Sequence, residues 1–310
     1  MLIAETQVRT DSNSDLIEFK PITLQDRQLI ISYVERFKPL SCEYNFANLF
    51  AWKKTHDFSY AHYQGRLLIY DKPNKCFFMP LGKNMTPEEL ADLSLNLAQK
   101  GYSPKFGLFT PEYLKLYPDI KNAFNISSSR DHAEYIYEVE SLCVLSGDKL
   151  HKKKNLITQF KRNYPDYRVH RLSEQFRAGC LKFARSLLNR QTPPSHDLIQ
   201  EITALEISFH YYEELGLEGR VLTVNDKIVA FSVFSRLNKL IYNVQFEKSS
   251  FEFKGAAQVI NHETAKALRP VCEFVNREQD LGLKGLRQAK MSYDPVKLLV
   301  PHTIEYIIPN

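Results

Sequence analysis

The chain has 310 residues, 44% of them hydrophobic and 25% charged, and its formal net charge is +5. This composition predicts a globular protein with a buried core and excludes an intrinsically disordered chain. The length predicts two domains or one large one, because a domain commonly contains roughly 100–200 residues.

The charge is unevenly distributed along the chain. Residues 1–145 contain 16 Lys and Arg against 18 Asp and Glu, whereas residues 146–310 contain 25 against 18. The basic C-terminal half predicts an anionic partner, such as a nucleotide, a cofactor phosphate or RNA.

Neither a membrane span nor a secretory signal is visible in the sequence. No apolar stretch approaches the roughly 18–20 residues that cross a bilayer, and the first residues lack a basic start followed by a long apolar core. We therefore expect a cytoplasmic protein. The five cysteines, Cys42, Cys76, Cys143, Cys180 and Cys272, are far apart and form no zinc-ligand pattern, so we expect neither disulfides nor a metal ion.

The N-terminal half predicts helices that interrupt a mostly antiparallel series of strands. Thr23 is a candidate N-cap for the first helix, Gln64-Gly65 predicts a hairpin turn, and Pro87 and Gly101 bound the clearest helix. Helices are expected over 23–37, 44–54, 87–99 and 111–117. Strands are expected over 16–21, 58–62, 66–71, 76–80, 105–109 and 132–139.

The C-terminal half repeats this order of elements loosely. Helices are expected over 149–163, 173–188, 197–215, 255–268 and 285–292. Strands are expected over 167–171, 220–225, 227–236, 239–247, 271–276 and 303–308. The order helix, helix, hairpin, strand, helix, strand, helix, strand is typical of a GNAT-type acyltransferase domain. We therefore predict an α+β fold of two tandem GNAT-like domains, 1–143 and 144–310, each a mixed, mostly antiparallel sheet flanked by helices.

A basic cluster opens the first helix of the C-terminal half. Lys152, Lys153 and Lys154 are consecutive, so they cannot all lie on one helix face. The functional interpretation is a phosphate contact, to a tRNA acceptor end or to a nucleotide cofactor. A solvated basic face is the alternative.

A turn before the helix at 255–268 occupies the place where GNAT domains bind a cofactor pyrophosphate through backbone N–H groups. Lys254, Gly255 and Ala257 fit such a cofactor-binding turn, but Glu252 stands where Gln or Arg is usual. A carboxylate there would repel a pyrophosphate, which argues against acetyl-CoA. A glycine that permits close helix packing is the alternative.

The densest polar run, residues 276–280, directly follows a predicted strand. Asn276 and Arg277 are candidate substrate-binding residues, because an arginine can clamp a carboxylate or phosphate at two points. Glu278 and Asp280 are candidate catalytic residues that could accept a proton from an attacking amine or hydroxyl. Strand alternation would place Arg277 opposite Asn276 and Glu278. A structural salt-bridge cluster is the alternative.

Four further residues are candidates for the same site. Tyr293 follows the last predicted core helix, where GNAT enzymes often place a tyrosine as a general acid. Tyr44 and Asn45 could bind substrate from the N-terminal half, and Glu43 could line the same cleft. Packing of Tyr293 and Tyr44, and helix capping by Asn45, are the alternatives.

Several of these segments together resemble a known family. They are Ser41 to Phe46 with Asn48 and Leu49, Lys149 to Asn155, Asn163 to Pro165, Asn276 to Gly282, Gly285 to Arg287, and Lys290 to Tyr293. The chain is similar to uncharacterised bacterial proteins grouped with the C-terminal domain of phosphatidylglycerol lysyltransferase. The resemblance implies a tandem GNAT fold, distantly similar to the Fem-type enzymes that add amino acids from aminoacyl-tRNA.

Two functions follow from the residues and the resemblance. The first is acyl or aminoacyl transfer to an amine or hydroxyl by direct attack, with aminoacyl-tRNA or acyl-CoA as the donor. The second is a non-catalytic GNAT-like module that binds a nucleic acid, a nucleotide or a protein partner.

Overall fold

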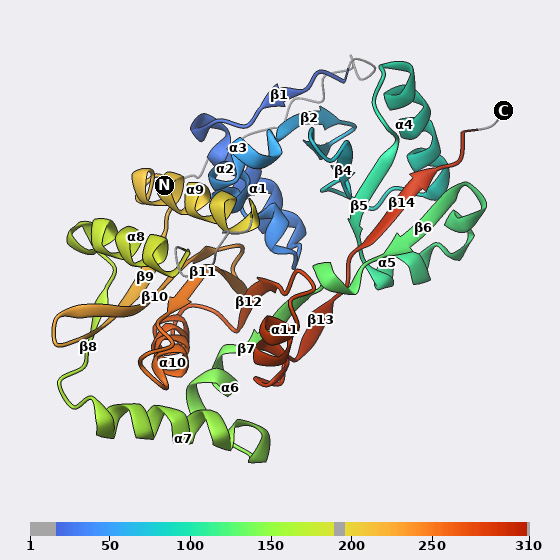
Figure 1. The fold of residues 1–310 in the computed structure, drawn as a ribbon. Coiled ribbons are helices and arrows are strands. Elements are labelled where there is room, and N and C mark those ends of the chain that lie inside the picture. Colours follow the sequence, from blue (N-terminus) through green and yellow to red (C-terminus); the bar gives the residue numbers. More distant parts are fainter. Residues whose placement is uncertain (1–16, 189–195, 309–310) are drawn as a thin grey trace, which may run out of the picture.

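Two seven-stranded sheets form the framework of the protein, and helices lie against both of them (Figure 1). The computed structural model describes residues 17–188 and 196–308. The first sheet has the strand order β1-β2-β3-β4-β5-β14-β6. Its strands are β1 (Lys20–Pro21), β2 (Ser59–Tyr63), β3 (Arg66–Asp71), β4 (Cys76–Phe78), β5 (Lys105–Phe109), β6 (Phe124–Ser128) and β14 (His302–Tyr306).

The second sheet repeats the pairing pattern of the first. From the opposite edge its order is β8-β9-β10-β11-β12-β7-β13. In each sheet the fourth and fifth strands are parallel, and all other neighbours are antiparallel. The strands are β7 (Glu134–Glu138), β8 (Arg168–Arg171), β9 (Glu218–Val224), β10 (Lys227–Arg236), β11 (Ile241–Ser249), β12 (Phe274–Gln279) and β13 (Lys297–Leu299).

The two sheets exchange their sixth strands. Strand β7 comes from the end of the N-terminal half but pairs with β12 and β13 of the second sheet. Strand β14 comes from the end of the chain but lies between β5 and β6 of the first sheet. The boundary between residues 143 and 144 stays a prediction, but the sheets do not divide there, because each one contains a strand from the other side of it.

Helices cover the sheets and fill the space between them. The α-helices are α1 (Arg27–Phe37), α2 (Phe46–Ala51), α3 (Lys53–His56), α4 (Pro87–Gln99), α5 (Pro111–Leu116), α6 (Val139–Val144), α7 (Asp148–Asn163), α8 (Glu174–Leu188), α9 (His196–His210), α10 (Ala256–Leu268) and α11 (Lys284–Met291). Short 3₁₀ turns are η1 (Leu24–Asp26), η2 (Cys42–Tyr44), η3 (Pro118–Asn122) and η4 (Arg130–His132). In Figure 1, α2 and α9 lie on one side of the second sheet, and α10 and α7 lie on the other.

One apolar core joins the two halves. It contains Phe46 and Phe50 of α2, Leu205 of α9, and Phe231 and Phe246 of the second sheet, all buried. A second core lies between that sheet and α10, and a third lies within the first sheet. The two halves are therefore joined by an apolar core as well as by the exchanged strands.

Most predicted elements are present, and the differences have local causes. Strand β6 was not predicted, because only its first residue, Phe124, is buried and the other four are exposed, which leaves no apolar alternation to detect. Strand β13 and helix α6 were also missed. Helix α9 ends at His210, whereas the sequence predicts a helix up to residue 215.

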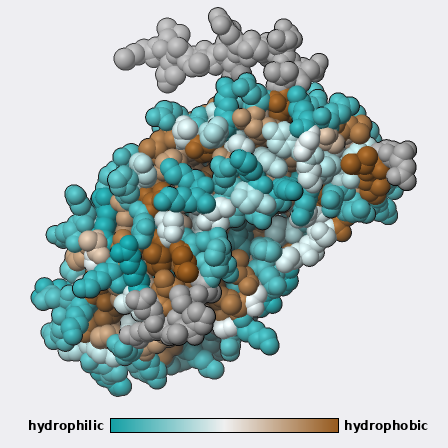
Figure 2. Space-filling model, turned by 45° about the horizontal axis from the view of Figure 1, so that its top comes forward, coloured by the Kyte–Doolittle hydropathy of each residue, from teal (hydrophilic) through white to brown (hydrophobic). Residues whose placement is uncertain are grey.

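Among the described residues, no helix is long and apolar enough to span a bilayer. The face in Figure 2 is mostly hydrophilic, with hydrophobic side chains in separate patches. The five cysteines are all unpaired. No group of three or more His, Cys, Asp or Glu side chains in residues 17–188 and 196–308 could hold a metal ion.

The strand exchange predicts that the chain end is essential for folding. A chain that ends at Val300 lacks β14, so the fully buried side chain of Ile304 is lost and β5 and β6 have no common neighbour. We expect this protein to be insoluble or to show no cooperative thermal transition, whereas a chain that ends at Ile308 should melt within about 2 °C of the full protein. Equal melting temperatures for both truncated chains would contradict the exchange.

Candidate functional site

A buried carboxylate anchors the polar layer between α2 and the second sheet. Glu134 of β7 is 1% exposed. It accepts hydrogen bonds from the Ser41 hydroxyl (2.5 Å), the Cys42 backbone N–H (2.7 Å) and the Asn276 side-chain amide (2.5 Å). Burial raises the pKa of Glu134, and these donors counteract the rise. Glu134 thus joins η2 of the N-terminal half to β7 and β12.

Glu278 lies at an irregular point of β12. The register with β7 shifts between Asn276 and Gln279, and Glu278 has a φ of 58°, which is uncommon for a residue other than glycine. Its backbone N–H donates to Asn276 Oδ1 at 2.8 Å, which supports this conformation. The bulge turns the Glu278 side chain toward α2.

Two amides from different halves hold the Glu278 carboxyl. Asn48 of α2 and Asn243 of β11 each donate from Nδ2 to Glu278 Oε1 at 2.8 Å. Burial raises the pKa of Glu278 to about 8, although these two hydrogen bonds lower it. No donor in the described part of the chain is bonded to the other carboxyl oxygen, Oε2. Glu278 therefore combines a fixed orientation with a pKa close to neutral.

Two more ionisable side chains near Glu278 have shifted pKa values. Burial, and then repulsion by Glu134, raise the pKa of Glu43 to about 7, and Gln279 Nε2 donates to Glu43 Oε1 at 2.8 Å. Burial, and then repulsion by Arg277, lower the pKa of Lys290 to about 8. Such shifts gather at sites where protons are transferred.

The opposite side of β12 carries a separate cluster. Arg277 pairs with Glu247 of β11 at 2.8 Å, and its guanidinium carbon lies 5.6 Å from the centre of the Tyr137 ring and 5.1 Å from that of Tyr293. Lys153 Nζ lies 4.5 Å from the Tyr293 ring centre. The expected alternation is therefore present, and it places Arg277, Tyr293 and Lys153 together but away from Glu278.

Asp280 is surrounded by donors. It has no exposed surface and forms ion pairs with Arg130 (3.2 Å) and Arg287 (2.7 Å), and the Tyr135 hydroxyl donates to it. Burial alone would raise its pKa, but these contacts, that of Arg287 foremost, hold the pKa well below its usual value. A carboxylate so fully bonded is a poor proton acceptor at neutral pH, and its contacts are those of a structural anchor.

Tyr44 and Asn45 make structural contacts near the layer. The Tyr44 hydroxyl donates to the Met79 carbonyl at 2.7 Å. Asn45 caps α2 by accepting from the Ala47 N–H at 2.9 Å, and it donates to the Ser235 hydroxyl at 3.1 Å. These are the packing and capping roles that the sequence left open.

Helix α7 covers the predicted pyrophosphate turn. Gly255 has a φ of 96°, and a Cβ there would lie 2.7 Å from the Leu156 carbonyl oxygen and 2.9 Å from Phe160 Cβ. The glycine therefore permits close packing of α7 against the start of α10. Lys254 is exposed and Ala257 is partly buried.

The basic cluster of α7 faces in two directions. Lys152 and Lys154 are exposed, whereas Lys153 is half-buried against Tyr293. Burial, and then repulsion by Arg277, lower the pKa of Lys153. Of the predicted site residues, Asn276 and Glu278 thus share one cluster, and Arg277, Tyr293 and Lys153 another. The catalytic and binding roles of all these residues stay predictions.

Four residues of the Glu278 cluster were not predicted from sequence, namely Asn48, Glu134, Asn243 and Lys290. Glu134 is the first residue of β7, directly before three buried residues, and Asn243 lies between Tyr242 and Val244 of β11; a polar residue next to such strand residues is the signal that could have found them.

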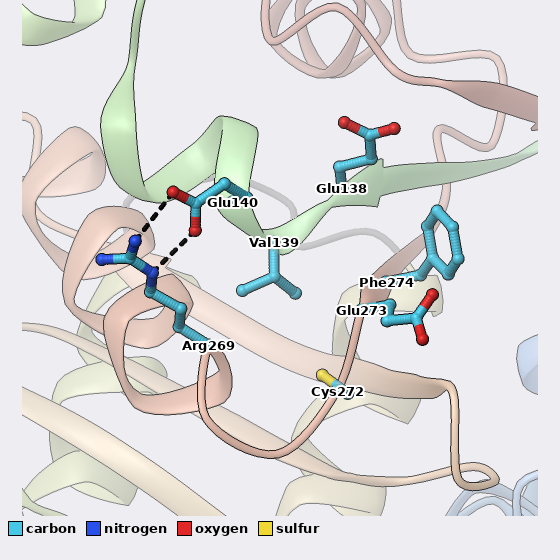
Figure 3. A pocket seen from close by; sticks show the side chains of 7 residues that line it. All are labelled: Glu138, Val139, Glu140, Arg269, Cys272, Glu273 and Phe274. Atoms are coloured by element: carbon cyan, nitrogen blue, oxygen red, sulfur yellow. Dashed lines mark hydrogen bonds and ion pairs between the residues drawn. The ribbon is translucent and has the colours of Figure 1, made fainter.

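A cavity of about 300 Å³ opens at the other end of β7 and β12 (Figure 3). Val139, Cys272 and Phe274 line it, and Glu140 pairs with Arg269 at its rim at 2.6 Å. The register pairs Phe274 with Glu138 at this end and Gln279 with Glu134 at the Glu278 end. No predicted site residue lines this cavity, so it is separate from the cluster.

Comparison with known proteins gives the fold a context. The family model "Phosphatidylglycerol lysyltransferase, C-terminal" matches residues 34–300. A conserved protein of unknown function from Bacteroides thetaiotaomicron is 29% identical, with a TM-score of 0.88 over 94% of this chain and 100% of that one.

Two more distant structures share the fold. The C-terminal domain of a putative lysylphosphatidylglycerol synthetase from Agrobacterium fabrum is 12% identical, with a TM-score of 0.62 over 90% of this chain and 92% of that one. FemX is 10% identical, with a TM-score of 0.58 over 94% and 97% of the two chains. The predicted fold class, two GNAT-like units in tandem, is confirmed.

The raised pKa values of Glu278 and Glu43 predict a pH-dependent stability. In the folded state the pKa values are about 8 for Glu278 and about 7 for Glu43, whereas the ordinary value is 4.5. Between pH 4.5 and pH 8 the folded state therefore binds more protons than the unfolded state. Their contribution to the free energy of unfolding is therefore complete below pH 4.5 and is lost as the pH rises toward 8.

Glu278→Gln removes one of these titrations. Between pH 5 and pH 8 the melting temperature of the variant should fall less than that of the wild type, by on the order of 5 °C. Replacement of the exposed Glu214 by Gln should leave the wild-type profile unchanged. Parallel profiles for Glu278→Gln and the wild type would show that the Glu278 pKa is ordinary.

Proposed function

Because the chain belongs to the family of phosphatidylglycerol lysyltransferase C-terminal domains, a group with an acyltransferase-type fold, we propose that it transfers an aminoacyl group from aminoacyl-tRNA to an amine or hydroxyl acceptor. The observation that carries the proposal is the Glu278 carboxyl. Asn48 and Asn243 orient it from the two halves, its pKa is about 8, and both of these donors bind the same oxygen, Oε1. A base works best when its pKa is near the working pH.

The reaction proceeds by direct attack. The acceptor amine or hydroxyl attacks the ester carbonyl carbon of the aminoacyl group, and a new C–N or C–O bond forms as the ester C–O bond to the tRNA ribose breaks. Glu278 takes the proton of the nucleophile and returns it to the departing ribose oxygen. The enzyme supplies orientation and a proton acceptor, and no covalent enzyme intermediate is required.

Helix α7 supplies the surface for the tRNA. Lys152 and Lys154 are exposed on it, and further exposed cations, Lys161 and Arg162, follow near its end. Phosphate contacts of this kind dominate nucleic-acid affinity and make it salt-dependent. Arg277, Tyr293 and Lys153 lie beneath this surface and support its position.

A specific observation favours a second candidate function. The Gly255 turn, where a GNAT enzyme would hold acyl-CoA, is packed against Leu156 and Phe160 of α7. A non-catalytic module that binds RNA through α7 would have no need of that turn. Binding of tRNA without any transfer to amines or hydroxyls would favour this candidate.

The tRNA contact predicts a loss of affinity on charge reversal. The double variant Lys152→Glu/Lys154→Glu should bind tRNA at least tenfold more weakly near physiological salt, and the slope of log affinity against log salt should fall by about 2. Lys153 is left in place because it packs on Tyr293. The control Lys115→Glu/Lys121→Glu changes the charge equally on exposed residues of the N-terminal half. Unchanged affinity of the α7 variant in a filter-binding titration would reject the contact.

The role of Glu278 predicts a loss of turnover. Glu278→Gln keeps the shape and the acceptor for Asn48 and Asn243 but cannot take a proton, so transfer from aminoacyl-tRNA should slow by about 10²–10⁴-fold. The melting temperature at pH 7 should not fall. A variant that loses stability and keeps its turnover would leave Glu278 with a structural role alone.

A further inference from the structure

Three buried amide oxygens in the layer between α2 and β11 have no hydrogen-bond partner within residues 17–188 and 196–308. They are Oδ1 of Asn48, Oδ1 of Asn243 and Oε1 of Gln245. Asn243 has no exposed surface, and the other two residues are 8% exposed. Buried acceptors are normally paired, because an unpaired one has lost its water without replacement. The layer therefore lacks donors at this place.

The side-chain nitrogens of Asn48 and Asn243 fix the orientation of these two amides. Asn48 and Asn243 both donate from Nδ2 to the same atom, Glu278 Oε1, at 2.8 Å. An ionised carboxylate only accepts hydrogen bonds, and a protonated carboxyl still accepts them at its carbonyl oxygen, so each amide turns its nitrogen toward Oε1. From amide bond lengths, both free oxygens lie within about 5 Å of Glu278 Oε1. Gln245 is held in the same way by Nε2, which donates to the Ser235 hydroxyl at 2.5 Å.

The charges around these oxygens are also unbalanced. Glu43, Glu134 and Glu278 lie in this layer. Lys290 acts electrostatically on Glu278, but its Nζ donates to the backbone carbonyls of Arg277 (2.6 Å) and Gln279 (2.5 Å) and to none of the three carboxyls. Glu134 is satisfied by its own three donors, but Glu278 is not. The place therefore lacks both donors and positive charge.

A primary ammonium group supplies both hydrogen-bond donors and positive charge. It has three N–H donors and one positive charge, whereas a water molecule has two donors and no charge. Glu278 is partly exposed, so a ligand can reach its carboxyl from solvent. The amide oxygens beside it are buried, so contact with them requires the Glu278 side chain to move aside.

We propose that Glu278, Asn48 and Asn243 bind the α-ammonium group of the aminoacyl substrate. The inference rests on the proposed function and deepens it, because it names what the site recognises. The ammonium donates to the Glu278 carboxylate and to the two amide oxygens. Its nitrogen is about 2.5 Å from the ester carbonyl carbon of the same amino acid, so binding brings the reacting carbon close to Glu278 Oε2. The site selects for a free α-amine.

The test uses a small ligand without tRNA. Glycinamide carries the α-ammonium and the carbonyl, and glycolamide replaces the ammonium by a hydroxyl. By calorimetry or NMR titration at pH 7, glycinamide should bind the wild-type protein saturably and glycolamide at least tenfold more weakly. This comparison needs no variant. Equal binding of the two ligands, or no binding of glycinamide, overturns the proposal and leaves a water molecule as the partner of the amide oxygens.

Variants locate the site. Glu278→Gln should weaken glycinamide at least tenfold, and Asn243→Ala should weaken it too, whereas Asn155→Ala on the exposed face of α7 should not. Unchanged glycinamide affinity in a folded Glu278→Gln protein overturns the assignment.

A second assay separates this proposal from the proposed function. Transfer from N-acetyl-aminoacyl-tRNA at the same rate as from aminoacyl-tRNA would sink the ammonium site and keep the transferase. Glycinamide binding with no transfer from any aminoacyl-tRNA would keep the site and sink the transferase.

Discussion

The buried carboxylate of Glu134 is the contact on which the rest of the site depends. Its three donors come from the turn at Ser41 and Cys42 and from Asn276, so a single side chain fixes the N-terminal half against β12. Asn276 in turn accepts the backbone N–H of Glu278 and so supports the bulge. Glu134 can do this only because β7 crosses into the second sheet. Loss of one partner of such a buried group is costly, because the others are left unpaired.

The number of hydrogen-bond donors around each buried carboxyl group differs, and it separates structural carboxylates from Glu278. Glu134 is saturated by donors and acts as an anchor, and Asp280 is saturated by Arg130 and Arg287. Glu278 receives donors on one oxygen alone, so burial is left to dominate and its pKa rises. The positive φ of Glu278 costs conformational energy, which Asn276 offsets in part. Backbone strain and a raised pKa together distinguish Glu278 from Glu134 and Asp280, whose contacts are structural.

Local signals made much of the fold predictable. Helix α4 was found from Pro87 and Gly101, which bound it in the sequence, and the structure adds a capping box of Thr86 and Glu89 at its start. The hairpin of β2 and β3 was found from Gln64-Gly65. The exchange of β7 and β14 was not predictable, because pairing between strands that are distant in the chain produces no pattern in the local sequence. The polar run at 276–280 was found, but the partners that separate Glu278 from Asp280 lie far away in sequence, with Asn48 and Arg130 distant by 230 and 150 residues.

The two clusters on β12 bear on the nature of the donor. Tyr293 lies between Lys153 of α7 and Arg277. The Arg277 side chain points away from that of Glu278, so the basic helix and the carboxyl cluster lie on opposite sides of one strand. Figure 1 places α7 and α2 on opposite sides of the second sheet. A compact donor cannot contact both surfaces, and the turn that would hold acyl-CoA is closed by α7. The proposed transfer therefore requires a donor long enough to contact α7 and Glu278 on opposite sides of the sheet, as an aminoacyl-tRNA with a single-stranded acceptor end is.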